Sequence, residues 1–241
     1  MEKLMYLVWD RPSEDPGERR QQMLDQIVPA LQEAGATDVS VHMRDDLVTI
    51  DGPAPAPAGE LPLVVGLGLW LPAHDRRTGI EAVLSGLGVR RAGYLVTEAS
   101  WCEYGENDRR GPRDWADGTR SPGITTFSLV HRNPRLDERR FREFWYGHQS
   151  PMSEKVQPRW RYVRNTVVHA VTDGAPLMDG IVVECWPSED VVADPIVFHG
   201  GHDDPRVGEE NLRVMLDSVD QLFVLDRLRS VAMSEYLFGI S

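Results

Sequence analysis

Residues 124–149 read ITTFSLVHRNPRLDERRFREFWYGHQ and carry the signals of a strand, a turn and a helix in succession. Residues 124–131 are an apolar run of strand-forming types, and Asn133-Pro134 is a turn signal. Residues 137–149 carry large side chains at helical spacing. Positions i, i+3, i+4 and i+7 are predicted to share one helix face: Phe141, Phe144, Trp145 and His148. A strand followed at once by such a helix predicts the start of a β-α-β-β-α-β unit.

The rest of the chain fits two such units. In the second half, strands are predicted at 162–171, 180–186 and 231–237, and a helix within 208–225. In the first half the same order is predicted through 5–9, 18–34, 39–43, 63–70, 76–87 and 89–99, with a stiff Pro/Ala loop at 52–59.

The predicted fold class is therefore α+β, with two tandem ferredoxin-like repeats. The repeats are expected at residues 1–105 and 123–241, joined by a polar linker at 106–122. An overlay of residues 17–29 on 139–151 supports a duplication and places Gln26 where His148 stands in the second repeat.

The charge and hydropathy of the chain exclude several kinds of binding partner. Lys plus Arg number 26 and Asp plus Glu 38, which gives a net charge of −12 and disfavours nucleic acid and anionic membranes. No apolar run approaches the ~20 residues that a membrane-spanning helix needs. Because no signal-peptide pattern opens the chain, a cytoplasmic protein is expected.

The usual cofactor motifs are lacking. Cys102 and Cys185 have no CxxC spacing, so no cysteine-based zinc site is predicted. Gly66 and Gly68 lack the third glycine of a dinucleotide fingerprint and are expected to allow a close approach to one sheet face. His199-Gly200-Gly201-His202-Asp203-Asp204 is interpreted as a solvated loop in preference to a metal site. We therefore expect neither a metal nor a cofactor.

Three motifs carry a family resemblance. Residues 141–151, FREFWYGHQSP, resemble the first helix of EthD-like proteins, and residues 161–165 (RYVRN) and 179–186 (DGIVVECW) resemble two later strands of that family. The resemblance covers residues 123–241, and the first half looks like a diverged repeat with Gln26 in place of the histidine.

This resemblance implies a dimeric α+β barrel, in which two ferredoxin-like sheets pack face to face and enclose a pocket. Here the two repeats would form that barrel within one chain. The wider superfamily includes cofactor-independent monooxygenases, cyclases, dehydratases, isomerases and haem-dependent peroxidases. The fold alone does not fix the chemistry.

His148 is the first candidate for catalysis, because an imidazole on an aromatic helix face is predicted to point inward with a pKa near working pH. Glu184 lies in a strand without adjacent charges. It is expected either to orient His148 or to form a salt bridge to Arg161 or Arg164 on the neighbouring strand. The alternative for His148 itself is a buried structural histidine.

Tyr162 and Asn165 are candidate hydrogen-bond donors to a developing oxyanion, but a regular strand places them on opposite faces, so one of them is expected to be structural. Four aromatic residues are candidates for lining a pocket for a flat apolar ligand, or for forming core: Trp145, Phe144, Phe127 and Trp186.

The leading hypothesis is an EthD-like enzyme that binds a small apolar carbonyl or aromatic compound. It would use a histidine for a dehydration, cyclisation, isomerisation or cofactor-free oxygenation. One alternative is a non-catalytic ligand-binding or assembly module. Another is a haem-dependent oxidoreductase with His148, His169 or His131 as axial ligand. A homodimer is a further possible assembly.

Overall fold

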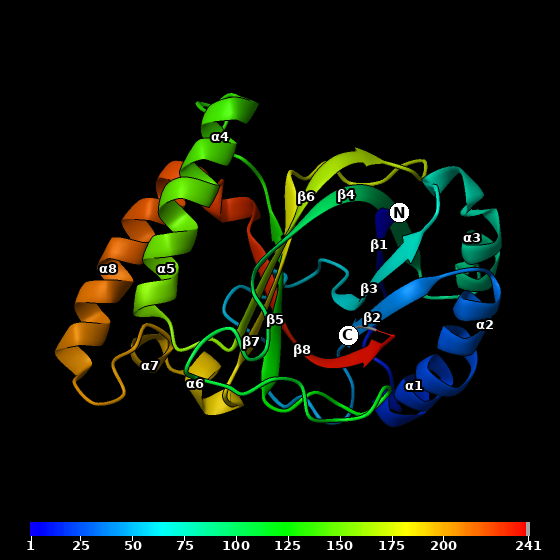
Figure 1. The fold of residues 1–241 in the computed structure, drawn as a ribbon, viewed down its shortest axis with the longest axis horizontal. Coiled ribbons are helices and arrows are strands. Elements are labelled where there is room, and N and C mark those ends of the chain that lie inside the picture. Colours follow the sequence, from blue (N-terminus) through cyan, green and yellow to red (C-terminus); the bar gives the residue numbers. More distant parts are fainter. Residues whose placement is uncertain (240–241) are drawn as a thin grey trace.

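Eight antiparallel strands close into one barrel in the computed structural model, which describes residues 1–239 (Figure 1). The strands are β1 (Glu2–Trp9), β2 (Thr37–Met43), β3 (Leu63–Leu71), β4 (Arg90–Cys102), β5 (Ile124–Val130), β6 (Arg161–Ala170), β7 (Gly180–Trp186) and β8 (Arg229–Phe238). Their order around the barrel is β1-β3-β2-β8-β5-β7-β6-β4. Each half of the chain thus supplies four adjacent strands, and β2 pairs with β8 and β4 with β6 where the halves meet. The predicted α+β barrel is confirmed.

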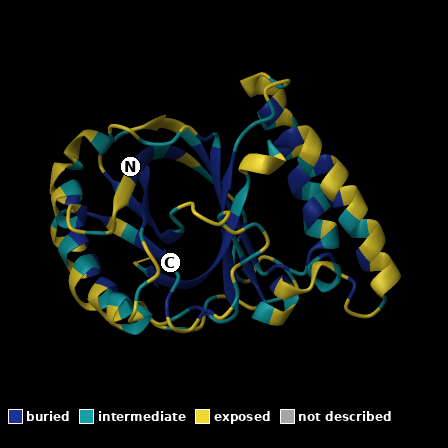
Figure 2. Ribbon diagram, turned by 180° about the vertical axis from the view of Figure 1, so that it is seen from behind, coloured by how far each residue is buried: buried dark blue, intermediate teal, exposed yellow. Residues whose placement is uncertain are grey.

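Helices cover two opposite sides of the barrel (Figure 1). The first half supplies α1 (Pro16–Gln22), α2 (Val28–Glu33) and α3 (Thr78–Leu84). The second half supplies α4 (Glu138–Phe144), α5 (Ser150–Val156), α6 (Glu189–Ala193), α7 (Pro195–Phe198) and α8 (Pro205–Leu222). Short 3₁₀ turns lie at His74–Arg76 and Leu225–Arg227. The strands are mostly buried, whereas the outward faces of the helices are exposed (Figure 2). No helix within residues 1–239 has the length and hydropathy needed to cross a bilayer.

A π-helical turn interrupts the long helical segment of each half, at Met23–Ile27 and at Trp145–Gln149. In the second half the N–H of Ser150 donates to the carbonyl of Trp145, five residues earlier. Pro29 and Pro151 follow the two turns, and each lacks the N–H that would bond to the carbonyl four residues before it. The wider turn changes which residues face the sheet.

His148 shows the consequence of this turn. Its predicted inward orientation is wrong, because the side chain is exposed, and Gln149 and Ser150 are buried in its place. The helical spacing that predicted one face from Phe141 to His148 assumes 3.6 residues per turn throughout. The π turn breaks that period between Trp145 and Gln149.

Side chains fill the interior of the barrel, including Met5, Leu7, Phe127, Val183 and Met233. A Cβ atom on Gly66 would lie 2.4 Å from the Phe127 ring, so the glycine leaves room for an aromatic ring from the opposite sheet. The close approach expected at this glycine is therefore present. The expectation of a pocket between the two sheets is wrong, because these side chains occupy that space and the cavity described below lies outside the barrel.

Candidate functional site

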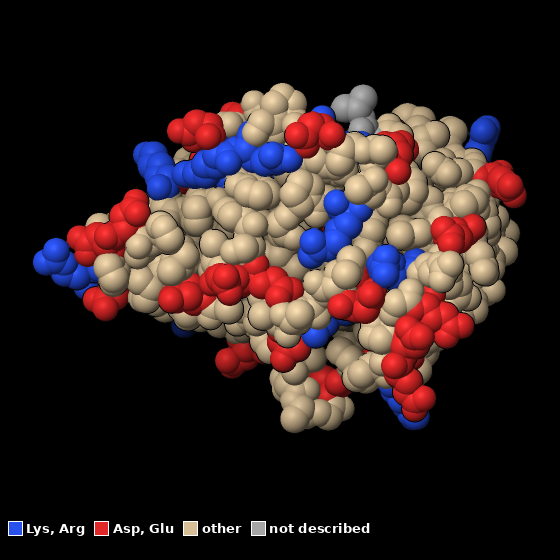
Figure 3. Space-filling view, turned by 90° about the horizontal axis from the view of Figure 1, so that it is seen from below, with Lys and Arg blue, Asp and Glu red and all other residues tan. Residues whose placement is uncertain are grey.

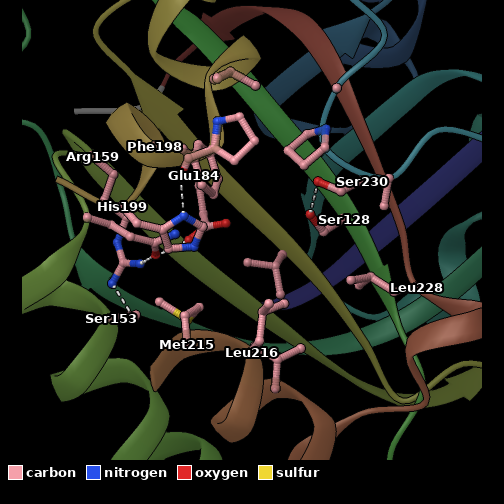
Figure 4. A pocket seen from close by; sticks show the side chains of 18 of the residues that line it. Ser128, Ser153, Arg159, Glu184, Phe198, His199, Met215, Leu216, Leu228 and Ser230 are labelled. Carbon is pink, nitrogen blue, oxygen red and sulfur yellow. Dashed lines mark hydrogen bonds and ion pairs between the residues drawn. The ribbon is translucent and has the colours of Figure 1, made fainter. Parts of the chain in front are cut away.

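A cavity of about 600 Å³ lies between the outer face of the second-half sheet and helices α5, α7 and α8. Much of its wall is apolar, with contributions from Val182, Leu216 and Phe223. Charged and polar side chains gather at one end, where Arg159, Glu184 and His199 lie close together, whereas Ser128, Ser230 and Leu228 lie at the other end (Figure 4). A cavity of this size with few polar groups is typical of a small-molecule site.

Strand alternation brings the wall residues of β7 into the cavity. Val182 and Glu184 face the helices, whereas Ile181 and Val183 belong to the barrel interior. Trp186 is on the helix side as well, but it is fully buried, and its ring centre lies 4.1 Å from that of Phe198. Of these three outward residues, Val182 and Glu184 line the cavity.

Arg159 organises the polar end. It is 1 % exposed and precedes β6. Its Nη1 donates to Glu184 Oε1 at 3.0 Å and to Gln157 Oε1 at 2.9 Å, and its Nη2 donates to Ser153 Oγ at 2.9 Å. The guanidinium carbon lies 4.0 Å from the centre of the Tyr162 ring. Arg159 Nε is buried and has no hydrogen-bond partner among residues 1–239.

Glu184 therefore pairs with Arg159, and the expected contacts to His148, Arg161 or Arg164 are wrong. Arg161 lies on the other face of β6 and pairs with Glu235 inside the barrel. Burial raises the pKa of Glu184, and the nearby Arg159 opposes that change without cancelling it. The carboxyl group thus takes up a proton more readily than an exposed glutamate.

His199 is a cavity residue that sequence reasoning assigned to a solvated loop. It follows α7 and is 7 % exposed. Its Nδ1 lies 2.6 Å from the carbonyl oxygen of Pro195. Because a carbonyl oxygen only accepts, Nδ1 carries the proton and Nε2 keeps a free lone pair. Burial lowers the pKa of His199, so the imidazole is neutral at neutral pH.

The glycines after His199 explain why that loop is ordered. A Cβ on Gly201 would lie 2.9 Å from the Cα of Gly208 in α8, so the chain passes close to this helix. Asp204 then begins α8 by accepting a hydrogen bond from the N–H of Arg206. His202 is exposed. The two-histidine segment is therefore a close turn between helices with one imidazole facing the cavity.

Tyr162 and Asn165 lie on opposite faces of β6, as the alternation predicted. Tyr162 lines the cavity, and its phenol oxygen accepts a hydrogen bond from Trp145 Nε1 at 3.0 Å. Burial raises the pKa of Tyr162, which keeps it protonated at neutral pH. Asn165 is fully buried on the other face, where its Nδ2 donates to the Ile181 carbonyl oxygen. Asn165 is therefore placed as a structural residue.

The aromatic candidates separate in space. Trp145 is 1 % exposed and lines the cavity. Phe144 is half-buried and contacts the exposed His148, with ring centres 4.8 Å apart. The expectation that Phe127 lines the same pocket is wrong, because β5 turns this ring into the barrel interior. The alternation of β5 decides this outcome, since Ser128 and Val130 take the cavity side.

The first half closes one side of the cavity. Residues 50–54, in the long loop between β2 and β3, belong to its lining. Ala54 and Ser230 exchange backbone hydrogen bonds, which attaches this loop to β8. The backbone N–H of Thr49 donates to Glu189 Oε1 at 2.8 Å, at the start of α6. Sequence periodicity gave no signal for this contact, because the loop and the cavity belong to different halves.

The structure shows no preformed metal cluster in its described part, since no group of three or more His, Cys, Asp and Glu side chains converges there. The histidines first considered as haem ligands also lie elsewhere. His148 and His169 are exposed, His131 is half-buried, and the cavity lining includes none of them. His199 is the histidine that lines the cavity.

Comparison with known proteins shows the fold. No family model matches the sequence, and no curated protein matches it. An anthrone oxidase-like protein superimposes with a TM-score of 0.58 at 11 % identity, over 100 % of this chain and 94 % of the other. Two proteins described as putative monooxygenases give TM-scores of 0.54 and 0.51. The Fusobacterium nucleatum protein is 6 % identical and the Lactobacillus acidophilus protein 7 %; each match covers 98 % of this chain, and 92 % and 94 % of those chains.

This chain therefore shares its overall fold with these three structures. Identities of this size show a common fold and no more. The narrower resemblance to EthD-like proteins stays a prediction from the three sequence motifs.

Proposed function

We propose that this protein is an enzyme that binds a small, largely apolar aromatic ketone or phenol in the second-half cavity and removes a proton from it with His199. The observation that carries the proposal is the Nδ1 bond to the Pro195 carbonyl, which leaves Nε2 of a neutral, buried imidazole as a proton acceptor beside an apolar cavity. A general base needs this combination of geometry and protonation state.

The neighbouring groups support this role. Arg159 places a buried positive charge beside the cavity, which favours the negative charge that develops when a carbon or phenol loses its proton. Glu184 and Ser153 hold the guanidinium in place. We assign Trp145 and Tyr162 to the wall, because their polar atoms bond to each other.

The reaction we infer is a cofactor-independent oxygenation. The solved structures with the same fold include an anthrone oxidase-like protein and two monooxygenase-like proteins, and anthrone is a flat ketone with an acidic methylene group. Loss of a methylene proton to His199 leaves an electron pair that attacks molecular oxygen. Breaking the O–O bond then converts the CH2 group and O2 into a ketone and water.

The test is oxygen uptake with anthrone as probe, together with quinone formation. We expect His199→Gln to lower kcat/KM by about 10² to 10⁴-fold, because glutamine cannot accept the proton. His202→Gln is the matched control, since His202 is exposed in the same loop. The native enzyme should lose activity as the pH falls below the pKa of His199, which lies under 6.5. Activity retained within a few-fold in His199→Gln would contradict the assignment.

A haem-dependent oxidoreductase is the second candidate function, and one observation favours it. A metal-bound imidazole usually donates its other N–H to a carboxylate or a backbone carbonyl, as His199 does to Pro195. The residues therefore fit a haem held through His199, and bound haem would supply one-electron chemistry at its iron. Titration with haemin decides this: a Soret shift that His199→Gln abolishes supports haem, and identical spectra for the two proteins exclude it.

We also propose that the two halves are diverged ferredoxin-like repeats. Within each half the strands are adjacent in equivalent orders, β4-β1-β3-β2 and β8-β5-β7-β6. The two π turns begin at residues 23 and 145, which are 122 residues apart, and the sequence overlay of 17–29 on 139–151 uses the same shift. Expression of each half alone tests whether either folds, by circular dichroism and thermal melting.

A further inference from the structure

We propose that the cavity binds its apolar ligand as an anion, with the charged group at the end where Arg159 and Arg164 flank Tyr162. The proposal rests on the assignment of this cavity as a ligand site under the proposed function. The new elements are the negative charge of the ligand and the role of Arg164. Arg164 does not line the cavity, and its unpaired positive charge attracts the negative group of the ligand from behind Tyr162.

Arg164 is a buried cation without a counter-ion. It is 5 % exposed and lies on the helix side of β6. Its Nη1 donates to Ser150 Oγ at 2.7 Å, and its guanidinium carbon lies 3.9 Å from the centre of the Tyr146 ring. Arg164 Nε has no hydrogen-bond partner, and no ion pair joins Arg164 to a carboxylate in the part of the chain that the structure describes. Arginine stays charged even when buried.

The charges around the polar end do not cancel. Arg159 bonds to Glu184 at 3.0 Å and to Glu154 at 3.3 Å, and Arg109 bonds to Glu154 at 2.9 Å. With Arg164, three guanidinium groups face two carboxylates, which leaves one positive charge. A buried charge without a partner destabilises a fold, so its presence calls for a compensating group.

The uncompensated positive charge at the polar end contrasts with the net negative charge of the chain. The chain has a net charge of −12, and acidic and basic side chains are interspersed over the face shown in Figure 3. The unpaired positive charge is instead buried beside Tyr162, whose ring centre lies 5.8 Å from the Arg164 guanidinium carbon. A negative group in the cavity would therefore complete the charge balance on the Arg159 side.

The cavity itself sets the orientation and class of the ligand. Arg159 and Glu184 lie at one end, and Leu228 and Ser230 lie at the other (Figure 4). The buried Nε of Arg159 is an unused donor on a residue that lines the cavity. The ligand is thus an aromatic body with one carboxylate, sulfonate, phenolate or enolate group near Arg159. An enolate of this kind also forms when His199 removes a proton.

Two dyes of the same shape provide the test. 8-Anilinonaphthalene-1-sulfonate carries an anionic group, and N-phenyl-1-naphthylamine is the same molecule without it. In fluorescence titrations of the full-length protein we expect about tenfold tighter binding of the anionic dye, as one nearby unpaired charge implies. Val219→Trp, which fills the cavity from α8, should weaken the binding of both dyes.

Arg164→Met separates recognition from structure. Because it removes an unpaired buried charge and keeps the side-chain bulk, we expect an equal or higher melting temperature together with loss of most of the tenfold preference. Arg139→Met, at an exposed position on α4, is the control and should change neither property. A lower melting temperature with an unchanged dye preference would show a structural role for Arg164 and overturn the proposal.

The outcomes also distinguish this proposal from the proposed function. Equal binding of the two dyes by the native protein overturns the anion preference and leaves the role of His199 intact. Binding of neither dye, or equal binding by Val219→Trp and the native protein, overturns the cavity as a ligand site and both proposals with it. An anion preference together with full activity of His199→Gln overturns the proposed function alone.

Discussion

The helix layers on the two sides of the barrel follow similar backbone paths but differ in what they enclose. After the π turn, the first half places Val28 and Leu31 against its sheet, both 0 % exposed. A shift of 122 residues leads to Ser150 and Ser153, which are equally buried but bond to Arg164 and Arg159. Apolar side chains close one layer into a core, whereas polar ones hold arginines beside a cavity. Side-chain polarity at matched positions, and not the backbone, distinguishes the two sides.

The sheets repeat this contrast. The outward residues of β2 and β3, such as Val41 and Leu67, pack into the apolar core under α2 and α3. The outward residues of β6 and β7 are Tyr162, Arg164 and Glu184 instead. Arg159 and Arg164 lie over the Tyr162 ring, and Glu184 pairs with Arg159. Burying such a group is favourable only when hydrogen bonds and counter-charges are complete. The second half therefore places polar and charged side chains beside a cavity, where the first half has a closed apolar core.

The largest expected effect comes from making the first half resemble the second. Leu31→Ser introduces the residue type of position 153 into an apolar core. We expect the free energy of unfolding to fall by about 3–5 kcal/mol, because the change creates a cavity and buries a hydroxyl group. Urea denaturation measures this. Gln32→Ser, at the exposed neighbouring position, is the control, and similar losses in the two variants would refute the assignment of Leu31 to a closed core.

A second prediction compares two buried histidines under acid. His42 in the barrel interior is 1 % exposed; burial, with Arg161 and Lys3 nearby, holds its pKa well below 6.5. Burial also lowers the pKa of His199. A lowered pKa means that the unfolded chain binds the proton more readily, so the stability that each neutral imidazole contributes is lost as the pH falls below 6.5.

We therefore expect His42→Gln to reduce the acid sensitivity of the native fold more than His199→Gln does. Each protonating group accounts for a slope of at most about 1.4 kcal/mol per pH unit. Urea denaturation between pH 7 and pH 5 measures the slopes. His202→Gln is the exposed control, and a larger change in slope for His199→Gln than for His42→Gln would contradict the ranking.

The smallest expected effect is that of a substitution at the contact between the two halves. Thr49→Val removes the hydroxyl that bonds to Glu189 and keeps the backbone bond at 2.8 Å. Since an exposed hydrogen bond contributes about 0.5–1.5 kcal/mol, we expect little change in stability and a few-fold weaker dye binding, because residues 50–54 line the cavity. Unchanged dye affinity would show that the loop keeps its position without the Thr49 hydroxyl, through backbone bonds such as those between Ala54 and Ser230.

The candidate site was only partly predictable. Strand alternation, which has a period of two, predicts that Tyr162 and Asn165 lie on opposite faces of β6, and they do. It does not predict which of the two faces meets the cavity. The inward orientation predicted for His148 is wrong, because a single π turn changes the helical phase, and the spacing of the large side chains does not indicate that turn. The cavity position of His199 was not predicted, because a histidine followed by two glycines resembles a loop until the close approach of Gly201 to Gly208 is known.

The sequence by itself determined the alternating strands, the four helical segments and the acidic character, because each is a local or periodic property. Only the tertiary structure decided that the barrel interior is filled and that the cavity lies outside it. It also brought Arg159, Glu184 and His199 together with residues 50–54 of the other half. Such convergence depends on barrel closure and on helix phase, which distant packing contacts fix and local spacing does not encode.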